Sequence, residues 1–214
     1  MKAIFGEFKT SLLLTAVFAV VLCGVYPLAV WAGGQAFFAA KANGSLVRDQ
    51  TGAVRGSSLL AQNFSSAKYF QPRPSAAGTG YDPLNSGGTN LGPTSAKLAN
   101  GLHTKDAGGK DVNDPNNFDG IADLAAAYRS ANGLAAGSPV PADAVTRSAS
   151  GLDPDISIAN AGLQAARVAG ARHLPLEKVM QLLAAHTQGR DLGVFGEARV
   201  NVLLLNLALD QEPP

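Results

Sequence analysis

The sequence has few of the groups from which catalytic or metal sites are usually built. It contains one cysteine and three histidines among 214 residues, so an intramolecular disulfide is excluded and the redox compartment stays open. A metal site is not expected either, because His103, His173 and His186 are far apart and lack nearby cysteines or paired carboxylates. Charged residues form only 15% of the chain, the net charge is +1, and Lys and Arg do not cluster. Nucleic-acid binding therefore has no electrostatic basis.

The common nucleotide and nucleophile motifs are also missing. Gly109-Lys110-Asp111 lacks the Ser or Thr that follows Lys in a Walker A loop, and Gly78-Thr79-Gly80 lacks the third glycine of a dinucleotide fingerprint. No Gly-x-Ser-x-Gly elbow is present. Ser148, Ser150 and Asp153 could form a triad with a distant histidine, but Ser and Asp in front of a helix usually cap it. The sequence therefore predicts a chain without a catalytic site of its own.

A long uncharged segment near the N-terminus is the strongest positive feature. The 21 residues of Ser11–Trp31 carry no charge, and eleven of them are Leu, Val or Phe. A helix rises about 1.5 Å per residue, so about 20 residues cross a hydrocarbon core of about 30 Å. We expect a short tail at residues 1–10, a transmembrane helix at 11–33 and a soluble domain at 34–214.

A cleaved secretory signal is the main alternative to an anchor. Lys2 and Lys9 would then form the charged leader, and Val30-Trp31-Ala32 loosely fits a cleavage site. The apolar segment is longer than the 7–15 residues, roughly, of a signal core, which favours the uncleaved anchor. Lipid modification of Cys23 is disfavoured because Leu22 precedes it and it lies inside the apolar segment.

Flanking charge predicts the orientation of this anchor. Lys2 and Lys9 lie on the short leading side, whereas Lys41 and Arg48 lie well beyond Trp31. Positive charge close to the membrane favours the cytoplasmic side. We therefore expect the N-terminus inside the cell and the domain outside it, anchored in a lipid membrane.

Small or compact residues recur at intervals of four along the predicted anchor. Such a stripe allows close approach of another helix, although spanning helices are rich in small residues in any case. The sequence therefore suggests, without requiring, that partner helices pack on the stripe Ser11, Thr15, Ala19, Cys23 and Pro27.

The soluble domain divides into loop-rich and helical parts. Residues 71–93 and 104–137 are dense in Gly, Pro, Asn and Asp, which favour turns, and only 123–128 within them suggests a short helix. In the last third, Asp153-Pro154-Asp155 resembles a helix start. The helix would run to Arg172 with an apolar face of small residues, namely Ile156, Ala159, Leu163, Ala166 and Gly170.

Two further elements complete the predicted mixed α+β domain. A second helix is expected from Pro175 to about Gln188, because Leu176, Val179, Met180 and Leu183 recur at helical spacing. A strand is expected from about Val200, leading into a short terminal helix.

Eight segments, in order along nearly the whole chain, resemble one family, the C subunit of Kdp potassium-transporting P-type ATPases. They are Tyr69-Phe70, Arg73–Ala76, Ser86–Pro93, Val140–Thr146, Ser148–Pro154 with Ile156-Ser157, Gln164 with Arg167–Ala169, Arg199–Leu203 and Leu205–Asp210. Segments matching in order are far more specific than any one alone. The resemblance implies a non-catalytic subunit of a potassium pump in the bacterial cytoplasmic membrane.

The resemblance also implies partners. They are a channel-like potassium-binding subunit, a P-type ATPase subunit that uses ATP with Mg, and a small helix subunit, so no cofactor is expected on this chain. The family is described as a catalytic chaperone that raises ATP affinity, and Gln164 is the residue that such a contact would use. Because the domain is predicted outside and ATP is inside, we expect an allosteric effect instead.

Two segments are the candidate docking surfaces, with the alternative that they only fold the domain. The first is the turn-rich segment Gln71–Pro93, with Ser86, Gly87, Gly88 and Asn90 as its motif. The second is Ser148–Pro154, with the residues Ser148, Ser150, Gly151, Leu152, Asp153 and Pro154. A membrane-anchored or secreted protein with its own enzymatic or binding activity remains the alternative function.

Overall fold

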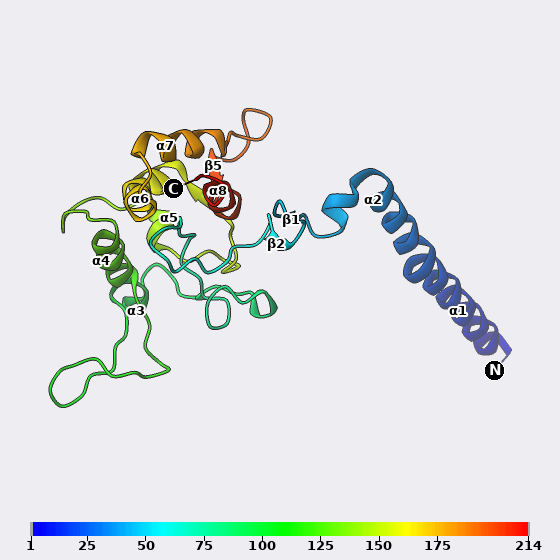
Figure 1. Cartoon of the computed structure of the whole chain (residues 1–214). Helices are drawn as coiled ribbons and strands as arrows, with labels where there is room; N and C mark the ends of the chain where they lie inside the picture. Colours follow the sequence, from blue (N-terminus) through cyan, green and yellow to red (C-terminus); the bar gives the residue numbers. More distant parts are fainter. Residues whose placement is uncertain (1, 214) are drawn as a thin grey trace. The chain divides into compact units, whose positions relative to one another are not determined.

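The computed structural model describes residues 2–213 (Figure 1). The chain forms two compact units, one ending at Leu46 and the other beginning at Val47. The first unit is a helical rod made of α1 (Lys2–Val20), a π-helical turn (Val21–Val25) and α2 (Tyr26–Ala42). The second unit mixes helices with short strands, which confirms the predicted mixed α+β class.

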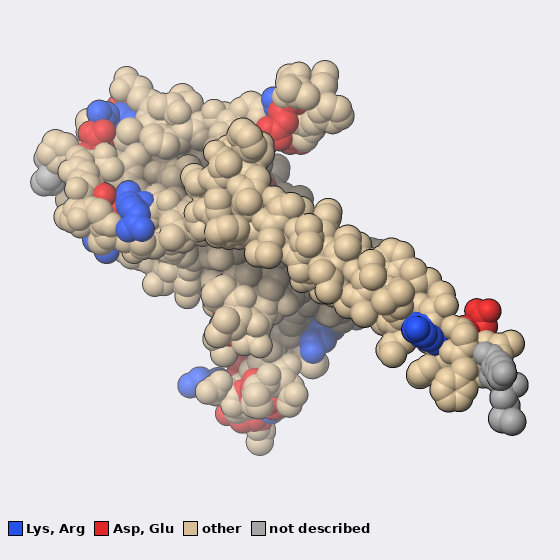
Figure 2. Space-filling view, turned by 90° about the vertical axis from the view of Figure 1, so that its right-hand side faces the viewer, with Lys and Arg blue, Asp and Glu red and all other residues tan. Residues whose placement is uncertain are grey.

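One helix of the described chain, Ala3–Ala42, is long and apolar enough to cross a membrane. Its surface is almost free of charged groups between the two ends of the rod (Figure 2). The predicted span 11–33 lies within this helix, but 40 residues correspond to about 60 Å of helix, twice the thickness of the hydrocarbon core. The bounds of the spanning part and its orientation therefore stay predictions.

A π-helical turn interrupts the rod just before Pro27. Pro27 has no backbone N–H and cannot make the usual hydrogen bond to the carbonyl four positions earlier. The N–H of Tyr26, the residue just before it, donates to the carbonyl of Val21, five positions back. A second irregularity lies at Phe38, whose backbone angles (φ −139°, ψ 34°) break the helix geometry. Proline is thus the physical reason for the first irregularity.

The second unit contains two small antiparallel sheets and several short helices. Strands β1 (Leu46–Arg48) and β2 (Val54–Ser57) form one sheet. The other has the order β3-β5-β4, with β3 at Asp155–Ser157, β5 at Arg199–Asn201 and β4 at Thr187–Gln188. The remaining elements are a 3-10 turn (Pro83–Asn85), α3 (Ala96–Asn100), α4 (Ile121–Ala131), α5 (Ala142–Val145), α6 (Ile158–Arg172), α7 (Leu176–Ala185) and α8 (Val202–Leu209).

The hydrophobic core lies where α6, α7 and α8 meet the three-stranded sheet. Helix α6 packs against α7, and α7 packs against α8. The central side chains are fully or nearly fully buried, among them Phe70, Ile156, Val168, Val179 and Leu205. Burying a side chain of this size contributes about 1.5–3 kcal/mol. The long irregular segment 58–82 contributes Phe70 to this core, and Phe64 packs against it.

The predicted start of the helix at Asp153-Pro154-Asp155 is wrong. Residues Asp155–Ser157 form strand β3, which pairs with β5 in the register Ile156 to Val200. Helix α6 begins at Ile158, and the Ser157 hydroxyl caps it by accepting from the Asn160 N–H at 3.1 Å. Pairing with a strand more than forty residues away overrides the local helix-start pattern, and the sequence does not reveal that pairing. The predicted end at Arg172 is confirmed.

The predicted buried face of this helix is wrong as well. Ala159, Ala166 and Gly170 are exposed, whereas the buried residues of α6 are Asn160, Ala161, Gln164, Ala165, Val168 and Ala169. The reason is that two amide side chains, Asn160 and Gln164, occupy the buried face. A pattern search that assigns amides to the solvent side therefore selects the opposite face of the helix.

The other element predictions are confirmed in type and corrected at their ends. The helix expected at 123–128 extends over Ile121–Ala131. Helix α7 ends at Ala185 rather than near Gln188, which lies in β4. The strand and terminal helix predicted from Val200 are present as β5 and α8.

Candidate functional site

Two buried amide side chains clamp the start of the Gly- and Pro-rich segment 71–93. The Asn206 amide accepts from the Phe70 N–H at 2.8 Å and donates to the Phe70 carbonyl at 2.9 Å. The Gln164 amide repeats this pairing on the next residue, accepting from the Gln71 N–H at 2.8 Å and donating to the Gln71 carbonyl at 3.1 Å. Helices α8 and α6 thereby hold the backbone of two consecutive residues, and we call this arrangement the amide clamp.

Gln164, the residue considered for a nucleotide contact, has all of its hydrogen-bonding groups engaged inside the domain. Besides the two bonds to Gln71, its Oε1 accepts from Arg167 at 2.8 Å and its Nε2 donates to Asn160 Oδ1 at 2.9 Å. The side chain is 1% exposed. An amide offers two donor hydrogens and one acceptor oxygen, so nothing is left for a ligand without breaking one of these bonds.

A cavity of about 320 Å³ lies beside the clamp and is lined in part by Phe64, Pro72, Tyr128, Asn160 and Gln164. Its volume is at the lower end of the range of small-molecule sites. The Tyr128 hydroxyl donates to the Asn160 side chain at 2.9 Å, and burial raises the pKa of Tyr128 to about 12. The phenol therefore remains protonated at neutral pH, and these three polar side chains bind one another.

The two segments predicted as docking surfaces lie against each other. The Ser86 hydroxyl and the Gly87 N–H both donate to the Ser150 carbonyl, each at 2.9 Å. The Ser75 hydroxyl donates to the Gly151 carbonyl at 2.7 Å, and the Ala61 N–H donates to the Leu152 carbonyl at 2.9 Å. The structure thus brings the two segments into one surface and gives both a role in folding.

Glycine is required at the centre of this contact. Gly151 has φ +69°, and a Cβ added there would lie 2.7 Å from the Ala77 nitrogen and 2.8 Å from the Gly87 carbonyl oxygen. Gly88 leaves room in the same way, since its Cβ would lie 2.9 Å from the Ala149 carbonyl oxygen. Close approach of two backbones is the physical reason for these glycines.

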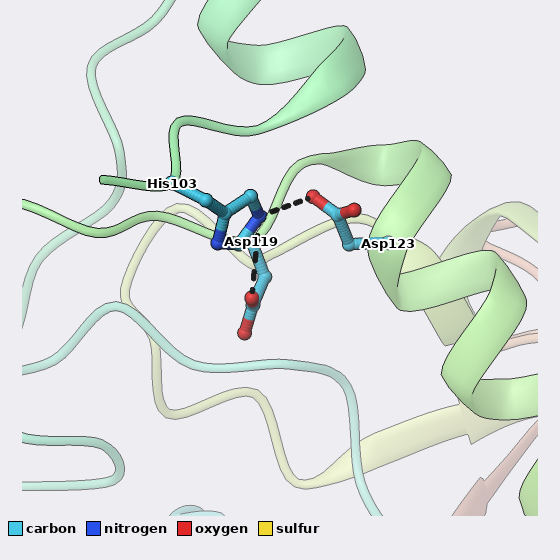
Figure 3. Close-up of side chains that lie close together, drawn as sticks. All are labelled: His103, Asp119 and Asp123. Carbon is cyan, nitrogen blue, oxygen red and sulfur yellow. Dashed lines mark hydrogen bonds and ion pairs between the residues drawn. The ribbon is translucent and has the colours of Figure 1, made fainter. Parts of the chain in front are cut away.

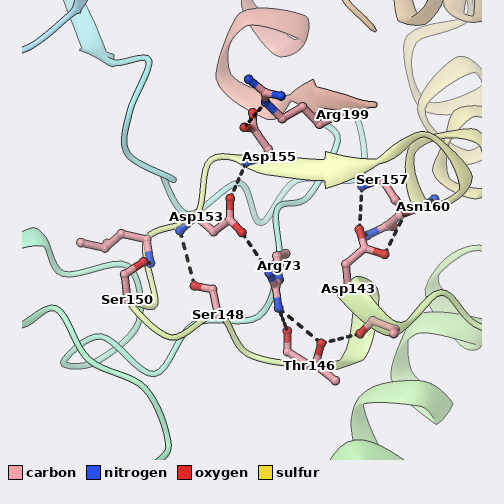
Figure 4. Close-up of polar contacts among 12 residues, drawn as sticks. Arg73, Asp143, Thr146, Ser148, Ser150, Asp153, Asp155, Ser157, Asn160 and Arg199 are labelled. Atoms are coloured by element: carbon pink, nitrogen blue, oxygen red, sulfur yellow. Dashed lines mark hydrogen bonds and ion pairs between the residues drawn. The ribbon is translucent and has the colours of Figure 1, made fainter. Parts of the chain in front are cut away.

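Charged groups tie the same surface together (Figure 4). Arg73 donates to the Asp153 carboxylate at 2.9 Å, and the other oxygen of that carboxylate accepts from the Asp155 N–H at 3.1 Å. Arg199 pairs with Asp155 at 3.2 Å. Burial, together with nearby Asp153, raises the pKa of Asp155, which Arg199 partly offsets. These carboxylates hold strand β3 in place rather than starting a helix.

The Ser148, Ser150 and Asp153 side chains do not form a triad. Ser148 Oγ accepts from the Asp153 N–H at 3.4 Å, and Ser150 Oγ accepts from the Leu152 N–H at 3.1 Å. Among residues 2–213 no hydrogen bond joins these side chains to a histidine. Both serines therefore cap turns, and neither caps a helix. Pro154 follows them, and its carbonyl accepts from the Val202 N–H at 3.0 Å.

One histidine does lie close to two carboxylates, contrary to the sequence-based expectation (Figure 3). His103 Nε2 is 3.1 Å from Asp123 Oδ2 and 3.9 Å from Asp119 Oδ1. The hydrogen bond to Asp123 raises the pKa of His103 and lowers that of Asp123. Asp123 also caps α4 by accepting from the Gly120 N–H at 2.8 Å. These contacts are those of an ion pair whose carboxylate also caps α4, so the cluster by itself is not evidence of a bound metal.

Asp143 and Asn160 are important residues that the sequence analysis missed. The Asp143 carboxylate accepts from the Ser157 N–H at 2.7 Å, the Ser157 hydroxyl at 2.9 Å and the Asn160 amide at 3.0 Å. It thereby fixes the start of α6, which carries Gln164. The sequence did contain one signal for Asn160. It lies four residues before Gln164, and residues four apart on a helix share a face.

The predicted packing stripe of the anchor crosses the π-helical turn. Ser11, Thr15 and Ala19 lie on α1, Cys23 lies in the turn and Pro27 lies in the first turn of α2. All five are exposed. Their packing against partner helices stays a prediction.

Comparison with known proteins shows similarity to one family. Residues 8–211 match the model of a family described as KdpC: K+-transporting ATPase, c chain. Proteins named potassium-transporting ATPase KdpC subunit are similar over most of their length. The relative from Mycobacterium tuberculosis is 48% identical over 201 residues, covering 94% of this chain and 96% of the relative. The relative from Myxococcus xanthus is 50% identical over 208 residues, covering 97% and 89%.

The segments that carry the sequence resemblance meet in space. The amide clamp joins Gln164 and Asn206 to the backbone that follows Tyr69. Arg167 donates to the Tyr69 carbonyl at 3.0 Å, and the Tyr69 hydroxyl donates to Asp210 at 3.0 Å. Membership implies association with a membrane, as part of a multi-subunit potassium-transporting complex. The chain belongs to the KdpC family, the c chain of K+-transporting ATPases.

Proposed function

We propose that the chain is a non-catalytic accessory subunit that assembles and stabilises the pump from outside the cytoplasmic membrane. Its helix anchors it beside the channel-like, ATPase and small helix subunits. Its domain lies on the outer side and contacts the channel-like subunit. Its effect on ATP use is allosteric, while ATP with Mg and the transported K⁺ are bound by its partners.

The engagement of Gln164 carries this proposal. Because the four hydrogen bonds of its amide hold α6 to the segment 71–93, a direct contact with nucleotide would cost the domain part of its own framework. An effect on ATP affinity through the partners requires no such cost. A coupling free energy of about 1–3 kcal/mol would change that affinity about 5- to 150-fold.

The outer edge of the two joined segments is the proposed contact with the channel-like subunit. Ser86, Asn90 and Ser150 are exposed although their segments are held by internal bonds. A surface held in one conformation loses little entropy on binding. This supports a preformed docking surface over a segment that folds on its partner.

Labelling of single cysteines tests the orientation. In a Cys23→Ser chain, Gln181→Cys, at an exposed position of α7 away from the proposed docking surface, should react with a membrane-impermeant maleimide on intact cells. Glu7→Cys, placed in the leading tail, should react only after permeabilisation. The reverse pattern would refute the outer location of the domain.

Photo-crosslinking tests the docking surface. A crosslinking residue at Ser86 or Asn90 should capture the channel-like subunit in native membranes. The same residue at Gln181, an exposed position on α7, serves as the matched control and should capture much less. Equal capture at all three positions would show that the joined segments are not a specific surface.

Measurement of ATP dependence tests the accessory role. The complex assembled without this chain should show a higher KM for ATP than the complete complex, while the purified chain alone should bind and hydrolyse no ATP. Hydrolysis by the purified chain, or an unchanged KM, would reject the proposal.

A further inference from the structure

A hydrophobic hairpin projects from the second unit between β4 and β5. In Figure 1 it is the orange loop that leaves the body of the domain after α7. Its three large apolar side chains are strongly exposed: Leu192 by 89%, Val194 by 67% and Phe195 by 63%. Residues 192–196 read Leu-Gly-Val-Phe-Gly and contain no charged or polar side chain. Exposed apolar groups gathered at one tip mark an interaction site.

Part of the backbone of this tip is hydrogen-bonded within the hairpin. The N–H of Asp191 and the carbonyl of Phe195 bond at 2.9 Å, as do the N–H of Phe195 and the carbonyl of Asp191. The N–H groups of Gly193 and Val194 donate to the carbonyls of Arg190 and Asp191. Leu192 (φ 54°) and Gly193 (φ 77°) adopt left-handed backbone angles that close the turn.

Charged side chains lie only at the neck of the hairpin, and they are paired. Arg190 contacts Glu197 at 2.7 Å, and Asp191 lies 3.6 Å from Arg199. The hairpin thus has an uncharged tip, in which the N–H groups of Gly193, Val194 and Phe195 are bonded internally, above a neck of paired charges. These are the conditions under which a loop enters a lipid interface, where unpaired backbone groups and unpaired charges are costly.

The connection between the predicted membrane anchor and the domain is short. Only three residues, Asn43, Gly44 and Ser45, separate the end of α2 from the start of β1. An extended chain spans at most about 3.6 Å per residue, so the four steps from Ala42 to Leu46 reach no more than about 14 Å. The nine helical residues between the predicted end of the span at residue 33 and Ala42 add about 14 Å, so the domain begins within about 28 Å of the bilayer and meets its surface at high effective concentration.

We propose that the hairpin 190–197 is a second membrane contact, whose tip Leu192, Val194 and Phe195 inserts into the lipid headgroup and acyl boundary. Leu and Phe are residues that settle at this boundary, and shallow insertion of about 5–10 Å is sufficient to hold such an apolar face. The contact restricts rotation of the domain about its short tether. It depends on the anchor and not on the identity of the partner subunits.

The single native tryptophan, Trp31, makes a fluorescence test possible. In a Trp31→Phe chain, Phe195→Trp provides one reporter at the tip, and Leu84→Trp provides a matched control at another exposed apolar position (91% exposed). Each full chain is reconstituted alone in phosphatidylcholine vesicles with and without bromine on the upper acyl carbons. The native chain, with Trp31 in the anchor, verifies helix insertion.

We expect blue-shifted emission and strong loss of intensity with brominated lipid for Phe195→Trp, and emission like that in water for Leu84→Trp. Adding Leu192→Ser and Val194→Ser to the Phe195→Trp chain should restore aqueous emission. An unquenched Phe195→Trp signal, in vesicles where Trp31 of the native chain is quenched, would overturn the proposal. So would a blue shift that arises only with the other subunits in lipid-free detergent, since the tip would then occupy a protein pocket.

Tip substitutions lie outside the core, so the unfolding temperature should be unchanged. Should Phe195→Trp disturb folding, a nitroxide on Val194→Cys in a Cys23→Ser chain measures the same contact. Greater accessibility to oxygen than to a polar nickel reagent in vesicles supports insertion. The reverse order of accessibility would contradict it.

Discussion

Replacing Gln164 by Leu tests whether this residue serves the fold. The substitution removes an amide of 1% exposure and takes from the N–H and carbonyl of Gln71 their partner, while Arg167 and Asn160 each lose one of several hydrogen bonds. Each buried polar group left unsatisfied costs about 1–3 kcal/mol. The cavity of about 320 Å³ beside the clamp admits water to some of them, which reduces the sum.

We therefore expect Gln164→Leu to lower the free energy of unfolding by about 3–5 kcal/mol. For a domain of this size, about 2–4 °C is lost per kcal/mol, so the unfolding temperature should fall by about 6–20 °C. Calorimetry of the full chain in detergent measures this change. Gln181→Leu makes the same chemical change at an exposed position of α7 and should stay within about 0.5 kcal/mol of the wild type.

A stability close to that of the wild type would refute the clamp as the main role of Gln164. If such a stable Gln164→Leu chain also raised the KM for ATP of the assembled complex, a direct nucleotide contact would become the better explanation. Loss of both stability and ATP affinity would instead agree with an effect transmitted through the domain.

Three further predictions follow from the geometry of the domain. Gly151→Ala should lower stability by more than about 2 kcal/mol, because it adds backbone clashes to the cost of a left-handed alanine. Gly109→Ala, with φ +79° and no atom within 4 Å of its Cβ, should show the backbone cost alone, and equal losses would contradict the close approach. Asp143→Ala should lower stability by about 2–4 kcal/mol in urea unfolding, since three donors at the start of α6 lose their acceptor; a change near zero would refute its role. The pair of His103 and Asp123 should stabilise the fold most between their ordinary pKa values of 6.5 and 3.8. Its contribution is lost as pH rises through the raised pKa of His103, and as pH falls through the lowered pKa of Asp123. His103→Gln should therefore flatten the stability difference between pH 6 and pH 8, and an unchanged difference would contradict the ion pair.

The apolar N-terminal helix and the terminal elements were predictable because their signals are local. A segment of 21 uncharged residues has few stable environments other than lipid. The apolar, β-branched start of Arg199–Leu209 likewise indicates a strand that leads into a helix. The order of the resembling segments also identified the family, although it did not indicate what each segment does in the fold.

The candidate site could be predicted only in part, because its contacts join distant parts of the chain. Gln164 was selected by resemblance, but its partners include Gln71, 93 positions away. The buried face of α6 was predicted wrongly for the same reason. Asn160 and Gln164 are stable in the core only because distant residues supply their hydrogen bonds, namely Tyr128, Asp143 and Gln71. His103 and its two carboxylates are 16 and 20 positions apart in sequence, and the fold alone brings them together.

The sequence by itself therefore determined the long apolar N-terminal helix, the mixed class of the domain and the family, because hydrophobic length and ordered motifs are properties of the chain. Only the tertiary structure decided which amides are buried, that Asp155–Ser157 is a strand, and that the two candidate docking segments form one surface. The physical reason is that a polar group is stable in the interior only beside its hydrogen-bond partner. Those partners are brought together by folding.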